Sequence, residues 1–317
     1  MSAFLALSAA TNLFAASLTV SPASILNDYT GQVSLTISGI PAAKTILVER
    51  FLDANGNGAI DAGEPLTFSF KVTDGQKPLI GGVRNPNVPG DDDGATNGSI
   101  RIDLPFPNLD GAFTSAAARF IFRVSDPQNS FSPITGIFDV QQKNQPQGVS
   151  GKITAAAGGA PLPGAFVLLA VPGGSPVAAL VTDSSGNYSF KTSPGSYSVF
   201  VIANGFVSDQ AAGAVTVVAN QFATKNLALT AAGFIISGKV SDSASGAAIP
   251  GVLVTADPQS VNNLFAGGLS DANGNYSFSV TAGQWKVKAF RKPGGTSRLP
   301  GGPEGHRQRH RQWRSHD

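Results

Sequence analysis

The sequence predicts an all-β protein made of three tandem β-sandwich domains, of which the last is incomplete. Three observations carry this prediction. One stretch of sequence occurs twice, so that Ser-Gly-Lys-Ile at 150–153 returns as Ser-Gly-Lys-Val at 237–240, an offset of 87. Val, Ile, Phe and Thr recur in short alternating runs, as expected of half-buried strands. Clusters of Gly and Pro separate these runs and leave no room for a helix longer than a turn or two.

The composition excludes several classes of protein. The chain has no Cys, so it can form no disulfide, thiolate nucleophile or cysteine zinc site. Its 37 Gly and 21 Pro make up 58 of 317 residues, below the share expected of a disordered low-complexity chain. The net charge of +2 is uneven, because seven Lys and Arg lie between 291 and 317. The rest of the chain is mildly acidic, and we expect no nucleic-acid partner.

The N-terminal segment, residues 1–17, is interpreted as a secretory signal peptide. Residues 4–16 are apolar, and Ala15 and Ser17 have the spacing of a signal-peptidase site. The basic residues that open such a signal are missing, so its true start is expected upstream, and the alternative is a mobile N-terminal arm. No later apolar run approaches the ~20 residues of a membrane span.

Residues 18–142 are predicted to form the first domain, an immunoglobulin-like sandwich. Three runs, 33–38, 66–71 and 120–124, alternate between apolar residues and others, so each should turn one face to a core and one to water. The polar segment 143–147 is the expected linker into the first repeat.

One segment of this domain has the pattern of a calcium site. Residues 53–64 fit the twelve-residue EF-hand loop, with oxygen side chains at positions 1, 3, 5, 9 and 12 and Gly58 at the sharp bend. The candidate metal ligands are Asp53, Asn55, Asn57, Ala59 through its carbonyl, Asp61 and Glu64. The flanking runs read as strands, so we expect a structural Ca²⁺ clamp of weak affinity, about 10⁻⁴ to 10⁻³ M. The alternative is an Asn-Gly hairpin without an ion.

A second acidic segment, residues 91–98, begins with three adjacent carboxylates, Asp91, Asp92 and Asp93, and has no closing Glu. It is interpreted as an exposed turn.

The two repeats occupy residues 148–231 and 233–293. Pro163-Gly164 returns as Pro250-Gly251 at the offset of 87, and the Asp-x-x-Gly-Asn-Tyr-Ser-Phe segment beginning at Asp183 returns at Asp271 at an offset of 88. The Asp of each segment should accept backbone N–H groups in a turn, and its Gly should take a positive φ. A period this long is too long for a solenoid, so each copy should be a small domain with its own core.

These marks resemble the carboxypeptidase regulatory-like domain, a transthyretin-like β-sandwich found as tandem modules on secreted and cell-surface bacterial proteins. The resemblance implies accessory modules, and none of the carboxypeptidase zinc ligands is visible. An internal Lys–Asn isopeptide bond from Lys152 or Lys239 is not expected, because no Glu lies between Glu64 and Glu304 to carry the protons.

The second repeat breaks off before its closing strand. The counterpart of residues 215–229 would fall at about 303–317, where Arg, Gln and His replace Val and Leu. We expect residues 294–317 to be a disordered basic tail from a fragment or out-of-frame ending, leaving an open sheet edge. The alternative is a tail that binds nucleic acid or anionic glycans.

The predicted function is non-enzymatic. All three His lie between 306 and 316, and no catalytic motif is present. We expect an extracellular or cell-surface monomer that acts as a stalk, adhesion or carbohydrate-contacting region, with polysaccharide or surface proteins as partners. The alternative is the non-catalytic arm of a longer secreted hydrolase or peptidase.

Overall fold

The computed structural model describes residues 15–53, 56–61, 64–86, 88–106, 117–172, 176–259 and 263–290. Within these ranges the chain forms 24 β-strands and one short 3-10 helix, Ala211–Gly213, which confirms the predicted all-β class. Nearly all of the predicted signal peptide, the whole predicted tail and Asn55 lie outside the described residues. In the part of the chain that is described, no helix has the length and apolar character needed to cross a membrane.

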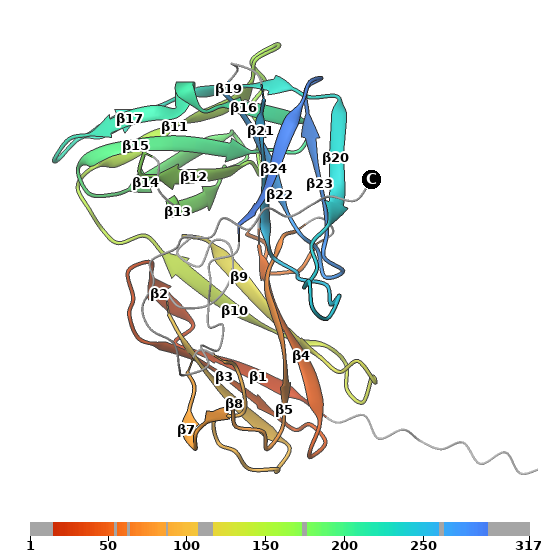
Figure 1. Cartoon of the computed structure of the whole chain (residues 1–317). Helices are drawn as coiled ribbons and strands as arrows, with labels where there is room; N and C mark the ends of the chain where they lie inside the picture. The colour runs from red at the N-terminus through yellow and green to blue at the C-terminus, as the bar shows by residue number, and fades with distance from the viewer. Residues whose placement is uncertain are drawn as a thin grey trace, which may run out of the picture.

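The first domain is a two-sheet sandwich, drawn at the bottom of Figure 1. One sheet has the order β1-β3-β8 and the other β2-β10-β9-β4-β5, and a small hairpin, β6–β7, lies apart from both. Their bounds are β1 Ser17–Ser21, β2 Ser24–Leu26, β3 Gln32–Ser38, β4 Thr45–Leu52, β5 Leu66–Thr73, β6 Leu79–Ile80, β7 Val83–Arg84, β8 Ser99–Pro105, β9 Arg119–Ser125 and β10 Ile134–Gln141. Strand β1 thus begins at the last residue of the predicted signal peptide.

Alternation in β3 works as the sequence predicts, because Val33, Leu35 and Ile37 are fully buried between the sheets. Strand β5 departs from it. Thr67, expected to face water, is fully buried, and its hydroxyl donates to the Arg50 carbonyl (2.8 Å). Arg50 itself points into the sandwich core, and its Nε donates to the same hydroxyl (3.0 Å).

The first repeat is a second sandwich. One of its sheets contains β14-β11-β19-β16, with β18 also paired to β11, and the other has the order β13-β12-β15-β17. Their bounds are β11 Gly148–Ala155, β12 Phe166–Ala170, β13 Pro176–Val181, β14 Asn187–Lys191, β15 Gly195–Ile202, β16 Phe206–Asp209, β17 Ala214–Val217, β18 Phe222–Thr224 and β19 Leu227–Ala231.

The second repeat reproduces the first five strands of the first. Its strands are β20 Phe234–Lys239, β21 Leu253–Pro258, β22 Leu264–Leu269, β23 Asn275–Val280 and β24 Trp285–Phe290. The pair β11–β14 places Val149 opposite Phe190, and β20–β23 places Ile236 opposite Phe278, which are the same two positions. The sequence repeat is therefore a repeat of strand register.

The predicted turns are also present. Asp183 Oδ1 accepts the backbone N–H of Asn187 (2.8 Å), and Asp271 Oδ1 accepts that of Asn275 at the same distance. Gly186 and Gly274 have φ angles of 76° and 78°, as the turns require.

The two repeats share strand β16. Its first half pairs with β19 of the first repeat and its second half with β22 of the second, so one sheet runs through both modules (Figure 1). Val207 of this strand belongs to the apolar core of the second repeat. The Phe200 ring of β15 packs on the Phe265 ring of β22, with centroids 5.5 Å apart. The first repeat has its own core, and its neighbours cover a further part of its apolar surface.

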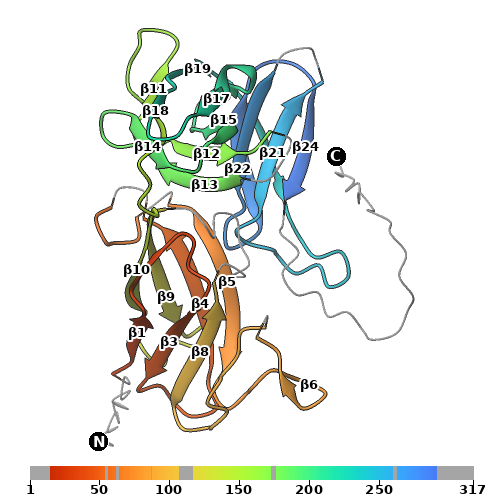
Figure 2. The same ribbon diagram turned by 90° about the vertical axis from the view of Figure 1, so that its left-hand side faces the viewer.

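Both repeats also lie against the first domain, as the two views in Figures 1 and 2 agree. Phe166 and Leu168 of β12 join the apolar cluster of the first domain. In the second repeat, the Gly251 turn lies so close to β5 that an added Cβ would stand 2.7 Å from the Thr67 carbonyl oxygen. The chain therefore folds back, and its last module contacts its first.

Candidate metal site and its surroundings

The predicted calcium loop connects β4 to β5. Asp53, its first position, is buried with 4% of its surface exposed. Its carboxylate accepts three backbone N–H groups, from Gly56 (2.6 Å), Asn57 (3.1 Å) and Gly58 (2.8 Å). Gly56 and Gly58 have φ angles of 73° and 79°, which an L side chain rarely adopts. The loop thus wraps around the Asp53 carboxylate.

The later loop positions bond to one another. Asn57 Nδ2 donates to Asp61 Oδ2 (2.7 Å), and the Asp61 N–H donates to Glu64 Oε2 (3.2 Å). Asn57 Oδ1 accepts the N–H of Ala59 (2.7 Å). Four of the six predicted ligands therefore contribute side-chain oxygens to one compact loop, and Ala59 lies within it.

The fit to an ion is incomplete in this arrangement. Across the described ranges, no three His, Cys, Asp or Glu side chains are grouped closely enough to hold a metal ion. The oxygen chemistry suits Ca²⁺, but Asp53 here serves the backbone, and the other oxygens accept N–H groups of the loop. Calcium binding at 53–64 stays a prediction.

Arg119 fixes one flank of the loop. Its guanidinium makes a two-point ion pair with Asp139 (2.8 and 3.2 Å), and Nη1 reaches the Gly56 carbonyl (3.4 Å). The hydrogen bond from Arg119 to Asp139 and the charge of Asp139 raise the pKa of the arginine. The backbone carbonyl of Arg119 also accepts the Asp53 N–H (3.0 Å), so β9 holds the start of the loop.

A shallow groove of about 790 Å³ separates the loop from the first repeat. Asp53, Gly56 and Ala117–Arg119 line one wall, and the Pro163-Gly164 turn and the Asp183 hairpin line the other. The candidate metal site therefore lies at a junction between modules.

The second acidic segment is exposed over residues 93–97, as the sequence predicts, but its first two carboxylates are not. Asp91 is fully buried and accepts the N–H groups of Gly75 (2.8 Å) and Arg101 (3.1 Å). Burial is the main reason that its pKa is raised. Asp92 forms an ion pair with Arg84, and although burial works against ionisation, this arginine holds the pKa of Asp92 below its ordinary value. Of the three carboxylates, Asp93 alone is exposed. The carboxylates of Asp91 and Asp92 accept backbone N–H groups of Gly75, Arg101 and Asp103. The segment therefore connects the loop after β5 to strand β8.

Lys152 and Lys239, the two lysines considered for an isopeptide bond, are both exposed on their strands. The chemistry of such a bond needs a buried carboxylic acid beside the lysine, and its absence stays a prediction.

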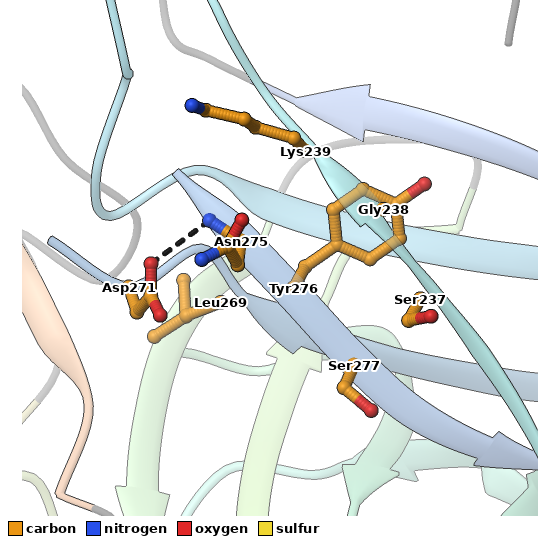
Figure 3. Close-up of a pocket in the computed structure, with 8 residues that line it drawn as sticks. All are labelled: Ser237, Gly238, Lys239, Leu269, Asp271, Asn275, Tyr276 and Ser277. Atoms are coloured by element: carbon orange, nitrogen blue, oxygen red, sulfur yellow. Dashed lines mark hydrogen bonds between the residues drawn. The ribbon is translucent and has the colours of Figure 1, made fainter. Parts of the chain in front are cut away.

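A second shallow groove, of about 680 Å³, lies on the β20–β23 sheet of the second repeat. Figure 3 shows its lining: Ser237, Gly238, Lys239, Leu269, Asp271, Asn275, Tyr276 and Ser277. The ring of Tyr276 lies over Gly238, and Asp271 accepts the backbone N–H of Asn275 beside it.

The sequence places the family signature on these repeats, and the comparison with family models agrees. A model described as the carboxypeptidase regulatory-like domain matches residues 148–230 and 235–300. The chain carries two tandem carboxypeptidase regulatory-like domains. The first regulatory-like domain supplies β11 to β19, and the second supplies β20 to β24.

Solved structures give only distant likenesses. The Bacillus anthracis TIE protein has a TM-score of 0.24 and 12% identity, covering 89% of this chain and 53% of its own. The shaft pilin SpaA from Lactobacillus rhamnosus GG has a TM-score of 0.22 and 11% identity, covering 62% of this chain and 88% of its own. The group B streptococcus pilus 2b backbone protein has a TM-score of 0.23 and 11% identity, with coverages of 68% and 97%.

This chain spans about half the length of the TIE protein. At such scores, the likenesses say nothing about the ligand or partner of this chain. A comparison with curated proteins finds no match.

Proposed function

We propose that this chain is a non-catalytic β-module region of a secreted or cell-surface protein, stabilised by calcium, that serves as a spacer and contact surface. The observation that supports this proposal best is that neighbouring modules share apolar core clusters. Apolar residues of β12 join the core cluster of the first domain, and Val207 joins that of the second regulatory-like domain. Such a chain holds its outer loops in fixed relative positions, as a spacer requires.

The calcium loop contributes to this role through its position. It closes the end of β4 and β5, and the Gly251 turn lies on the Thr67 backbone just beyond it. Ca²⁺ at 53–64 would replace loop hydrogen bonds by ligand bonds and hold the start of β5 in place. A ligand that binds only the folded state stabilises it by mass action.

The calcium proposal is tested by thermal unfolding of the full chain in millimolar Ca²⁺ and in chelator. We expect a higher Tm in Ca²⁺, and an Asp53→Ala, Glu64→Ala double variant should not respond to the ion. Asp93→Ala is the matched control, because Asp93 is an exposed carboxylate of the other acidic segment and should leave the response intact. Equal Tm values for the wild type in Ca²⁺ and chelator would refute the clamp.

Polysaccharide or a surface protein is the partner class we expect for the contact surface. The direct test is retention of the full chain on insoluble polysaccharides such as cellulose, chitin and xylan, against a bare-resin control. If the chain is retained on none of these polysaccharides, the carbohydrate-contacting role is refuted. The spacer role would be unaffected. Turnover of any glycoside or peptide substrate by the purified chain would contradict the non-catalytic assignment.

A further inference from the structure

The two regulatory-like domains differ in what covers their first strand. In the first, β18 and β19 run parallel to β11 and complete its sheet, and β17 completes the opposite sheet beside β15. In the second, no strand within the described residues pairs with the free side of β20 or of β24. The first regulatory-like domain therefore shows how a strand could pair with the free side of β20 in the second domain.

Besides the strand pairing of β18 and β19 with β11, three hydrogen bonds fix the residues between these two strands. The Lys225 N–H donates to the Ser150 carbonyl (2.7 Å), and the Tyr188 hydroxyl donates to the Lys225 carbonyl (2.6 Å). The side chain of Asn226 accepts the N–H of Lys152 (2.9 Å). Gly151 is required at this contact, because a Cβ there would collide with the Lys225 carbonyl.

Every group of the first domain that receives this segment is repeated in the second. Ser150, Gly151 and Lys152 correspond to Ser237, Gly238 and Lys239 at the offset of 87, and Tyr188 corresponds to Tyr276 at 88. These four counterparts line the groove of about 680 Å³ in Figure 3. The strand registers are the same, so the Ser237 carbonyl and the Lys239 N–H face away from β23. The groove therefore contains the same groups that bind the 222–229 segment in the first domain.

Apolar side chains are also more exposed in the second domain than in the first. Val199 of the first domain is fully buried, and its counterpart Val287 is 40% exposed. Phe234 and Ile235 at the start of β20 are 60% and 71% exposed. In the first domain, Phe222 of β18 lies opposite Gly148, the counterpart of Ile235, and Leu227 and Leu229 of β19 lie opposite Ile153 and Ala155 in the buried core. The second domain thus presents both an unpaired strand edge and an apolar surface.

We propose that the β20 groove of the second regulatory-like domain binds an extended polypeptide strand from another protein molecule, parallel to β20, in the register that Phe222–Leu229 adopts on β11. The strand presents its backbone N–H to the Ser237 carbonyl and its carbonyl to the Tyr276 hydroxyl. An Asn at the next position accepts the Lys239 N–H. A Phe at the position of Phe222 covers Ile235, and the Leu-x-Leu after the Asn lies opposite Val240 and Asp242. This is recognition by strand addition, in which main-chain bonds give affinity and alternate side chains give specificity.

The chain's own C-terminal residues have the wrong composition for this strand. Residues 291–317 contain no Asn and a single Leu, Leu299, which is followed by Pro. Proline lacks the N–H that strand pairing uses. Residues 291–317 therefore do not match the strand that Phe222–Leu229 provides.

The probe is a labelled synthetic peptide that copies residues 220–231, titrated into the full chain and followed by fluorescence anisotropy. We expect saturable one-to-one binding. A Lys225→Pro peptide should bind at least tenfold more weakly, because it loses the N–H directed at Ser237. An Asn226→Ala peptide should bind about two- to tenfold more weakly, the range for one hydrogen bond. These comparisons leave the protein unaltered, so misfolding cannot produce them.

A protein variant locates the site. Tyr276→Phe should weaken binding about two- to tenfold. Tyr188→Phe is the matched control, because its hydroxyl serves the segment already present in the first domain. It should leave peptide affinity unchanged. A loss of affinity in Tyr188→Phe and not in Tyr276→Phe would place the peptide in the first domain and overturn the proposal.

Hydrogen exchange decides between a partner strand and the chain itself. Without peptide, the Lys239 amide should exchange faster than the Lys152 amide, and peptide should protect it. Equal protection of the two amides before any peptide is added would mean that this chain fills its own groove, which overturns the proposal. No binding of the wild-type peptide, or equal binding of the Lys225→Pro peptide, would overturn it as well.

Discussion

At the residue scale, Arg50 is the side chain whose surroundings the sequence indicates least. Its guanidinium is fully buried in the first domain, and neither Nη1 nor Nη2 has a hydrogen-bond acceptor. The ring centroid of Phe120 lies 4.8 Å from the guanidinium carbon and that of Phe68 lies 5.8 Å from it. Burial lowers the pKa of Arg50 to about 10, so the group remains charged at neutral pH. Cation–π contacts offset only part of such a desolvation cost.

Replacing this charge with an apolar side chain of similar length should therefore stabilise the protein. We expect Arg50→Met to raise the free energy of unfolding at pH 7 by about 1–3 kcal/mol, measured by urea denaturation. The matched control is Arg123→Met, which removes the partner of buried Glu49 (Nη2 to Oε2, 2.7 Å) and should lower the same quantity. Changes of the same sign in both variants would contradict this account of Arg50.

Asp126 gives a pH dependence of known sign. Burial opposes its ionisation, but hydrogen bonds from the Ser130 N–H, the Gln128 N–H and Lys44 outweigh burial and lower its pKa well below 3.8. A carboxylate with a lower pKa in the folded state contributes stability above the unfolded pKa and loses it as the pH falls through the folded pKa.

We therefore expect Asp126→Asn to lower the free energy of unfolding at pH 7 by about 1–3 kcal/mol, from the loss of charge-assisted bonds. The difference from wild type should shrink as the pH is lowered from 5 towards 2. Urea denaturation at a series of pH values measures it. A difference that does not vary with pH would show that the ionised carboxylate is not the stabilising form.

At the scale of elements, the two Pro-Gly turns are a natural matched pair. Gly164 and Gly251 have φ angles of 68° and 69°, so Ala is strained by the same amount at both. A Cβ at Gly164 meets nothing within 4 Å, whereas one at Gly251 meets the Thr67 backbone of β5. The first turn is open to solvent, and the second is an interface between modules.

Gly164→Ala should therefore cost about 1 kcal/mol of stability, and Gly251→Ala should cost more. The excess should appear as faster hydrogen exchange at the start of β5, around Thr67, in Gly251→Ala alone. If both variants lose the same stability and β5 exchange is unaltered, the turn does not press on the first domain.

Much of each module could be predicted from sequence. The offset of 87 to 88 predicts equivalent registers in both repeats, and the Asp183 and Asp271 turns form as expected. The sharing of β16 could not be predicted. Two of its four residues pair with a strand 55 to 57 residues later in the chain. A run of four residues is too short for its sequence pattern to indicate which strand it pairs with.

The spacing of oxygen side chains locates the candidate calcium loop, and the structure adds the three N–H groups that Asp53 accepts. Alternation alone shows which face of a strand is apolar, but not whether water or another module covers the opposite face. Thr67 is expected to be exposed for that reason and is fully buried. Asp91, expected in an exposed turn because of its charge, is fully buried as well.

At the scale of the whole molecule, the shared cores predict cooperative unfolding. Phe166, Leu168 and Phe200 of the first regulatory-like domain pack on its neighbours, so this domain in isolation would expose them to water. We expect calorimetry of the full chain to give one main transition, with calorimetric and van't Hoff enthalpies in agreement. A Phe200→Lys variant should split or broaden it by weakening the contact with Phe265. Three separate transitions in the wild type would show that the modules unfold independently.

The contact between Gly251 and Thr67 also determines how the chain would respond to mechanical load. Because the last module rests on the first, tension applied between the chain ends passes through this contact as well as along the backbone. A pulled molecule should first swing the second regulatory-like domain away from β5, releasing length while every sandwich is still folded. The sandwiches would unfold only at greater extension. The fold-back therefore lets the chain lengthen without unfolding, which three modules arranged in a straight row could not do.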